Sequence, residues 1–152
     1  MENPRTISRE FALQALFYMD MRNDTSSEKL ELFCDVFTIS KKSLPFFLEL
    51  VNGVTSVMPE VDSIIERFSD NWKISRMSGV DRNAIRMAAY EMLYREDIPT
   101  KVSINEAINL GKKYGSEDSG AFINGILDSI RIALDKNELS RLGGLDKQMK
   151  QN

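Results

Sequence analysis

The sequence contains no histidine and a single cysteine, Cys34. Without imidazole there is no Ser–His or Cys–His pair and no histidine ligand for a metal ion, so an enzyme would have to use carboxylates or lysines. A stand-alone enzyme is therefore the least favoured function, and no catalytic residue, metal site or cofactor is predicted. A lone thiol cannot form an internal disulfide, and Cys34 is expected to be an ordinary buried residue.

Long hydrophobic runs are also missing. No apolar run approaches the roughly 18–20 residues that span a bilayer, and the N-terminal segment MENPRTISRE lacks the basic and then apolar form of a secretory signal. We therefore expect a cytoplasmic protein with no membrane partner. The formal net charge of −3 argues against a surface wholly devoted to nucleic acid, so any polyanion binding would depend on a local patch.

Apolar residues recur at helical spacing in every extended segment, and no sustained two-residue alternation is present. The sequence therefore predicts an all-α fold of about seven helices in two small packed bundles. The expected division is an N-terminal subdomain over 1–70 with a basic arm, a C-terminal subdomain over 71–134, and a flexible tail over 135–152. The boundary is placed at the segment around Trp72, which interrupts the helical pattern.

Several helix starts can be predicted from capping signals. The first helix is expected over 8–20, and the second opens with a capping box, Thr25-x-x-Glu28. The third begins after Ser43 and the fourth at Pro59. The fifth covers 79–94 with apolar residues around nearly its whole circumference, and a surface ion pair between Glu91 and Arg95 is expected on it. A second capping box, Ser103-x-x-Glu106, opens the sixth helix, and Asp118 or Ser116 caps the last.

Phe17 points about 170° away from the apolar stripe of the first helix, with Leu13 beside it. An exposed Phe–Leu pair is either covered by another part of the chain or contacts a partner. On sequence alone intramolecular cover is slightly favoured. Both residues are nevertheless candidates for partner binding.

Phe122 falls about 80–100° from the middle of the last helix's apolar stripe, on the same flank as Asp118. An aromatic at that edge could stack a base of single-stranded RNA, and Arg5, Arg9 and Lys112 could neutralise phosphates. The alternatives are that Phe122 only packs and that the basic side chains are simply solvated.

Asp81 and Asp118 each lie where a helix is expected to begin. An acidic residue there is stabilised by the helix dipole, which is the simplest explanation for both. At the margin of a phosphate-binding surface, however, a carboxylate would weaken binding because like charges repel. In that setting it would limit the affinity for RNA.

Five segments, in this order and at these separations, carry a family resemblance: REFALQAL, NW, VDRNAIRMAAYEM, IPTKVSINEAINLGKKYG and EDSGAFINGILD. Together they resemble the NusB family of bacterial transcription antitermination factors. The likeness covers nearly all of residues 5–134 and is strongest over 71–128. Composition and periodicity alone indicate only an all-α domain with unusual surface residues.

The resemblance implies a fold of two three-helix-type bundles without catalytic activity. It implies a partner, NusE, the small-subunit ribosomal protein that also serves in transcription. The pair is expected to bind boxA single-stranded RNA in the nascent transcript, in contact with the transcription elongation complex, and to support ribosomal RNA transcription.

The resemblance also assigns roles by position. Phe17 and Asp81 match family positions in the partner contact. Arg5, Arg9 and Phe122 match the RNA-binding arm and the opening turn of the last helix, with Asp118 as the acid that tunes binding. For Phe17, this strengthens the outward interpretation.

One feature departs from the family pattern. The arm is often dense in arginine, whereas here Glu2 lies in it and only Arg5 and Arg9 supply positive charge. With fewer phosphate contacts, RNA binding would be weaker and less salt-dependent. The hypothesis is that this protein binds boxA-like RNA poorly alone and needs the partner's surface.

Two further functions stay open as alternatives. The chain could be a self-associating protein–protein adaptor whose RNA site is masked, since some NusB-like proteins form homodimers through faces near the RNA surface. It could also be the RNA-targeting domain of a ribosomal RNA methyltransferase, but that enzyme needs a cofactor-binding domain, which is not seen before Asn152.

Overall fold

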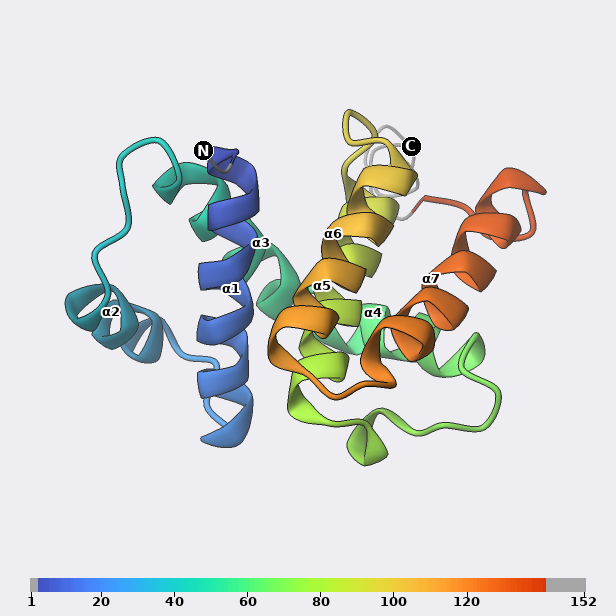
Figure 1. Ribbon diagram of the computed structural model, residues 1–152, viewed down its shortest axis with the longest axis horizontal. Helices are drawn as coiled ribbons and strands as arrows, with labels where there is room; N and C mark the ends of the chain where they lie inside the picture. The colour runs from blue at the N-terminus through green and yellow to red at the C-terminus, as the bar shows by residue number, and fades with distance from the viewer. Residues whose placement is uncertain (1–2, 142–152) are drawn as a thin grey trace, which may run out of the picture. The chain divides into compact units, whose positions relative to one another are not determined.

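The computed structural model describes residues 3–141, and over this range the prediction of an all-α fold is confirmed. The described residues form seven α-helices, one 3₁₀ turn and no strand (Figure 1). In chain order these are α1 (Pro4–Met21), α2 (Ser27–Val36), α3 (Leu44–Ser56), α4 (Met58–Arg67), the 3₁₀ turn η1 (Ile74–Arg76), α5 (Gly79–Tyr94), α6 (Thr100–Tyr114) and α7 (Ser119–Asp135). No helix within residues 3–141 combines the length and the apolar character that crossing a membrane requires.

The chain divides into two compact units, Met1–Met58 and a second that begins at Pro59. In the first unit α1 packs against α3 and more sparsely against α2. In the second, α5, α6 and α7 pack against one another. The expected boundary after residue 70 lies later than this division. Asp62 and Glu66 of α4 bond to Arg86 and to the amide of Ile74, so α4 belongs with the second unit.

Helix α1 begins four residues before the predicted start at Ser8. Asn3 caps it, because its side chain accepts a hydrogen bond from the Arg5 amide at 2.8 Å, and Pro4 occupies the first helical position, where its missing N–H costs nothing. Arg5 therefore lies in a helix rather than in an extended arm. Its side chain projects from a fixed backbone.

Both predicted capping boxes are wrong. Helix α2 begins after Ser26, one residue beyond Thr25, and Ser26 itself makes no side-chain cap bond. Ser103 lies a full turn inside α6, where its hydroxyl donates to Glu91 Oε1 at 2.8 Å. Glu91 is buried rather than at the surface, and its carboxylate accepts the hydrogen bond of the buried Ser103 hydroxyl between α5 and α6.

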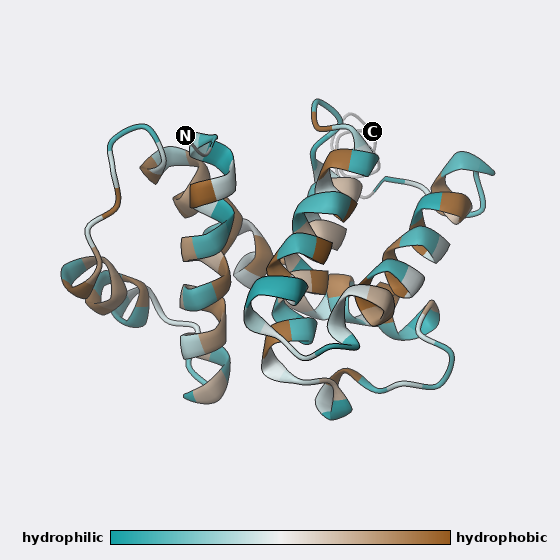
Figure 2. Ribbon diagram, in the orientation of Figure 1, coloured by the Kyte–Doolittle hydropathy of each residue, from teal (hydrophilic) through white to brown (hydrophobic). Residues whose placement is uncertain are grey.

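The core of the second unit surrounds α5, as its all-round apolar pattern predicts. Its side chains from position 82 to 93 are buried with the exception of Tyr90, and they pack against inward residues of α7 such as Ile123 and Leu127. Helices α6 and α7 each carry both hydrophobic and hydrophilic residues (Figure 2), as expected of helices that cover a core on one side.

Beyond α7 the chain makes a short ordered turn. Asn137 adopts a left-handed conformation with φ 60°, the amides of Glu138 and Leu139 both donate to the Ala133 carbonyl, and Leu139 is buried. The expected flexible tail begins at 135, but 136–141 are ordered, and the remainder lies outside the described residues. Cys34 is half-buried rather than buried.

Candidate nucleic-acid interface

A surface cavity of about 360 Å³ in the second unit joins three of the predicted site residues, Asp81, Asp118 and Phe122. The first comes from the opening turn of α5 and the other two from the start of α7. The loop after α4 and the 3₁₀ turn complete the wall with Trp72, Arg76, Met77 and Ser78. A residue assigned to the partner and two assigned to RNA thus line the same hollow.

Phe122 lies at the edge of the buried face of α7, as its helical position predicts, and is partly exposed. It meets the indole of Trp72 edge to face, with ring centroids 5.4 Å apart and an angle of 72° between the planes. The indole is 50% exposed. The cavity therefore has an aromatic wall formed by Phe122 and Trp72, and Trp72 is not among the predicted site residues.

Asp81 occupies the first turn of α5, and its amide donates to the hydroxyl of the N-cap residue Ser78 at 3.2 Å. Its carboxylate oxygen Oδ1 is buried and has no hydrogen-bond donor among the described residues. A buried carboxylate oxygen without a donor is costly, so such an atom commonly finds its partner in a ligand or another protein.

Asp118 immediately precedes α7 but does not cap it, contrary to prediction. Its side chain is exposed and makes no cap hydrogen bond. Ser119 Oγ instead accepts from the amide of Ser116 at 2.9 Å, which fixes the turn from within. The Asp118 carboxylate is therefore held at the cavity by backbone geometry and not by a structural bond of its own.

Lys112 is exposed near the end of α6, and its side chain runs past the first turn of α7. A Cβ added at Gly120 would lie 3.4 Å from Lys112 Cε and 3.5 Å from Cγ. The lysine therefore reaches the helix start that carries Asp118 and Phe122.

The two predicted arginines of α1 differ in exposure. Arg5 is exposed and Arg9 is only 3% exposed, although the guanidinium carbons of both lie over the Phe46 ring, at 4.8 and 5.1 Å from its centroid. The prediction of two free basic side chains is therefore wrong for Arg9. Its cation is engaged by an aromatic face inside the first unit, a favourable contact when water is excluded.

Phe17 points outward and is 37% exposed, whereas Leu13 is only 3% exposed. The predicted outward Phe–Leu pair is therefore wrong for Leu13. The buried arc of α1 runs from Ala15 round to Leu13, about 160° wide at about 100° per residue, and Phe17 lies about 40° beyond its edge. The sequence interpretation had assumed a narrower stripe.

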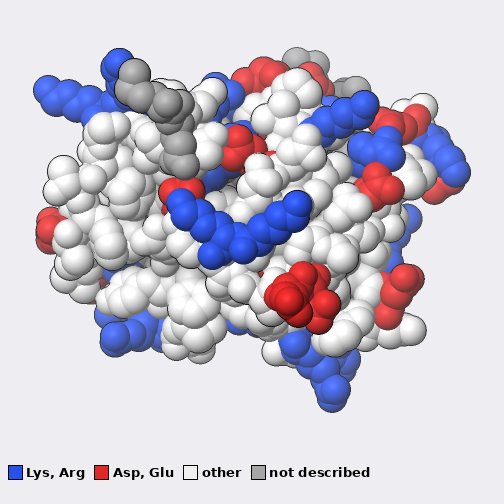
Figure 3. All heavy atoms as spheres, viewed as in Figure 1, with Lys and Arg blue, Asp and Glu red and all other residues white. Residues whose placement is uncertain are grey.

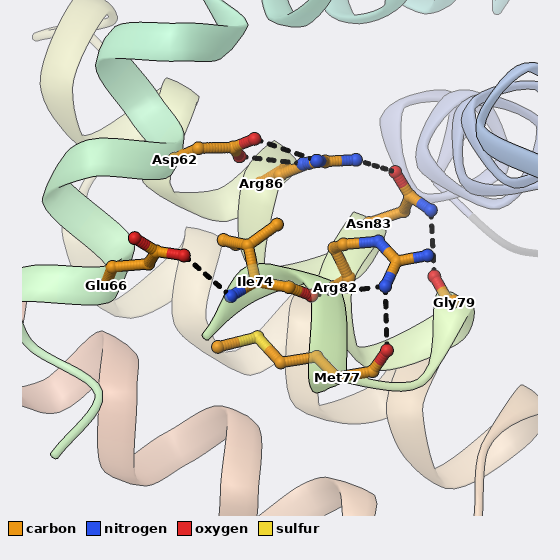
Figure 4. A network of polar contacts seen from close by, with 8 residues as sticks. All are labelled: Asp62, Glu66, Ile74, Met77, Gly79, Arg82, Asn83 and Arg86. Atoms are coloured by element: carbon orange, nitrogen blue, oxygen red, sulfur yellow. Dashed lines mark hydrogen bonds and ion pairs between the residues drawn. The ribbon is translucent and has the colours of Figure 1, made fainter. Parts of the chain in front are cut away.

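A network of polar contacts that the sequence did not predict lies behind the cavity (Figure 4). Arg82 donates to the carbonyls of Ile74 and Met77, at 3.2 and 2.7 Å, and Glu66 Oε1 accepts from the Ile74 amide at 2.9 Å. Arg86 pairs with Asp62 through two bonds of 2.8 Å. The charged residues on α5 appear in the sequence as exceptions to an apolar helix. Buried charges of this kind need partners, and that requirement was the available signal.

Charges of both signs are interspersed on the face drawn in Figure 3, in keeping with the small net charge. No field of one sign covers that face. Within residues 3–141 no group of three or more Cys, Asp or Glu side chains is arranged to hold a metal ion.

Comparison with known proteins identifies the family. The sequence model of the NusB family matches residues 6–131. The transcription antitermination protein NusB of Desulfatibacillum aliphaticivorans is 52% identical over 134 residues, covering 88% of this chain and 94% of that protein. The NusB protein of Myxococcus xanthus strain DK1622 is 48% identical over 136 residues, covering 87% and 97%.

Solved structures show the same fold. T. maritima NusB matches with a TM-score of 0.79 and 38% identity, covering 91% of this chain and all of that one. A NusB chain from a complex of the antitermination factors NusB and NusE with double-stranded RNA matches with a TM-score of 0.79 and 28% identity, covering 88% and 99%. On this agreement of sequence and fold over nearly the whole length, the chain belongs to the NusB family of transcription antitermination proteins.

Proposed function

We propose that this protein pairs with NusE and binds boxA single-stranded RNA in the transcription elongation complex, supporting transcription of ribosomal RNA. The family relation and the related NusB–NusE–RNA complex support the classes of partner. The observation that carries the proposal in this chain is the cavity that joins Asp81, Asp118 and Phe122.

The second unit supplies the better-formed part of the RNA surface. Lys112 gives a cation beside the start of α7, Phe122 gives an aromatic edge, and Asp118 gives a negative charge that limits phosphate binding. In the first unit Arg5 is the exposed arginine of the predicted pair, since Arg9 is buried. The cationic contribution of α1 is therefore smaller than its sequence suggests.

The partner contact is assigned to Phe17 and Asp81. Phe17 offers an outward aromatic ring on a helix that is otherwise well packed, which is the kind of side chain that anchors a protein interface. Asp81 offers a carboxylate oxygen without a donor, which suits a cationic or N–H group on another molecule. Leu13 is only 3% exposed, so we do not include it in the partner contact.

Titration of labelled boxA RNA with the protein alone and with the protein–NusE pair tests the proposal. Because few cations are exposed at the predicted site, we expect weak binding alone and clearly tighter binding by the pair. Equal affinities would refute the requirement for the partner, and failure of both samples to bind would refute the proposed function.

A second candidate function, self-association as an adaptor, has one observation in its favour. A surface cavity of about 370 Å³ in the first unit is lined by Gln14, Tyr18, Leu32, Phe33, Val36 and Phe37. Two of these lining residues, Leu32 and Val36 of α2, are exposed. Exposed apolar side chains of this kind are often covered in an oligomer. Sedimentation with and without RNA separates the two functions, since an adaptor with a masked RNA site dimerises and its dimer does not bind RNA.

A further inference from the structure

The cavity beside α5 and α7 is lined by more negative than positive charge. Asp81 and Asp118 both contribute carboxylates, and Arg76 is the lining cation. A phosphate group would therefore be disfavoured inside it, because like charges repel at short range. An uncharged aromatic group pays no such penalty. The cavity volume of about 360 Å³ falls in the range of small-ligand sites.

The backbone that carries Trp72 is fixed, although half of the indole surface is exposed. Asp70 and Asn71 before it have positive φ values of 46° and 73°, a conformation that Asp and Asn tolerate better than most residues. The buried hydroxyl of Ser69 donates to the Trp72 carbonyl at 2.6 Å, and the Trp72 amide donates back to the Ser69 carbonyl at 3.0 Å. Consecutive residues in sparsely populated conformations persist where the surroundings fix them, which is common at binding sites.

The neighbouring turn is fixed from behind as well. Glu66 holds the amide of Ile74, and Arg82 holds the carbonyls of Ile74 and Met77, so the backbone that carries Arg76 is bonded at both ends (Figure 4). The aromatic wall and its adjacent cation therefore exist before any ligand binds. A site built in advance loses less conformational entropy on binding.

We infer that Trp72 and Phe122 form a subsite for one unpaired RNA base, which stacks on the exposed indole, and that in the protein without NusE Asp81 Oδ1 accepts a hydrogen bond from an amino group of that base. This inference rests on the proposed function and adds to it a second aromatic residue, Trp72, and a preference for bases that carry an amino group. Adenine, cytosine and guanine carry an exocyclic amino group, whereas the N3–H donor of uracil lies between two carbonyl oxygens that the carboxylate would repel. The phosphates of the same nucleotide stay outside, where Arg76 and Lys112 are exposed.

The test uses the full-length protein and boxA RNA, with the Trp72→Ala and Trp72→Phe variants. Removal of the indole is expected to weaken RNA binding by about tenfold, because base–aromatic stacking contributes on that scale, and Phe should restore most of it. Ile132→Ala is the matched control. It also removes an exposed apolar side chain, but one that lies on α7 outside the cavity, so the variant should bind RNA like wild type. Wild-type affinity in Trp72→Ala would overturn the inference.

A scan of RNAs with one abasic nucleotide at each position locates the stacked base. At that position the abasic RNA and Trp72→Ala should cause the same loss, and combining them should add nothing further. Additive losses at every position would overturn the subsite. Since Trp72 is the one tryptophan of the chain, its fluorescence reports the site in the wild-type protein, and unchanged emission at saturating RNA would also contradict stacking.

Base exchange at the located position tests the role of Asp81. Wild type should prefer an amino base to uracil there by several-fold in the absence of NusE, and Asp81→Asn should abolish that preference, since an amide can both donate and accept. An unchanged preference would remove Asp81 from the subsite. If Trp72→Ala weakened binding of NusE but not of free RNA, a protein side chain would be the occupant and the inference would fail. Wild-type protein that bound no RNA, with or without NusE, would refute the proposed function itself.

Discussion

Exposure of single side chains separates the residues of α1 that the sequence had grouped. Phe17 and Leu13 are four positions apart and share a helix flank, yet one is outward and the other is in the core. Arg5 and Arg9 are also four apart, and only Arg5 is exposed. Helical spacing predicts direction to within tens of degrees. The width of the buried arc depends on which elements pack against the helix, which periodicity does not reveal.

The contrast between Phe17 and Leu13 gives a paired prediction. Phe17→Asp should abolish pairing with NusE and leave the helical circular dichroism spectrum unchanged, because the side chain is already outside the core. Leu13→Ala should lower the free energy of unfolding by about 2–5 kcal/mol, because it leaves a cavity. Co-purification with NusE and thermal melts of both variants measure these effects. Loss of helix in Phe17→Asp would place that ring in the core instead.

The exposed carboxylate of Asp118 permits a prediction in the opposite direction. Asp118→Asn should tighten binding of boxA RNA by about two- to fivefold, because it removes one negative charge that repels the phosphates and is only partly screened by water. Stability should not change, because the side chain makes no cap bond. Asp128→Asn is the control, since the same charge is removed from α7 where it pairs with Arg131. Equal effects of the two variants on RNA affinity would argue for net charge rather than position.

At the scale of helices, the order and approximate extent of all seven α-helices could be predicted from apolar spacing. The starts of α3 after Ser43 and of α5 at Gly79 are confirmed, but several others are wrong, because Ser and Thr serve several purposes. Ser103 resembles a cap in sequence, but its hydroxyl satisfies the buried carboxylate of Glu91. Asp118 and Ser116 resemble caps as well, yet Ser119 Oγ accepts the hydrogen bond. Only the tertiary neighbours distinguish a cap from a buried polar pair.

The contact between α6 and α7 predicts opposite effects for two glycines. A Cβ at Gly111 would lie 2.5 Å from Ile123 Cδ1, and that isoleucine is fully buried, so it has little room to move. Gly111→Ala should therefore destabilise the protein by about 1–2 kcal/mol, the overpacking cost less the gain in helix propensity. Gly125 is an exposed position of α7, and a Cβ added there would meet no atom within 4 Å. Gly125→Ala should therefore stabilise the protein by about 0.5–1 kcal/mol. Chemical denaturation of both variants decides, and stabilisation in both would mean that the helices separate easily.

For the molecule as a whole, the family resemblance predicted more than composition did. Charge and periodicity indicate an all-α protein without showing where it binds, whereas the order of five motifs indicates the family and its partners. The aromatic wall at Trp72 could not be predicted, because the indole meets Phe122 across fifty residues of chain. The expected boundary at 70/71 places α4 in the first unit, whereas the hydrogen bonds of Asp62 and Glu66 connect α4 to the second unit.

The small number of exposed cations at the predicted RNA site determines the expected salt dependence of RNA binding. Each phosphate neutralised on a single strand contributes about −0.7 to the slope of log affinity against log salt concentration. If Arg5, Arg76 and Lys112 act and the buried Arg9 does not, the slope for the protein alone should be about −2.1. NusE should make the slope steeper, because the pair adds the partner's cations to the phosphate contacts. Fluorescence anisotropy at several salt concentrations measures both slopes. A slope for the protein alone steeper than about −3 would mean that cations beyond this set contact phosphates, including an Arg9 that leaves its buried position.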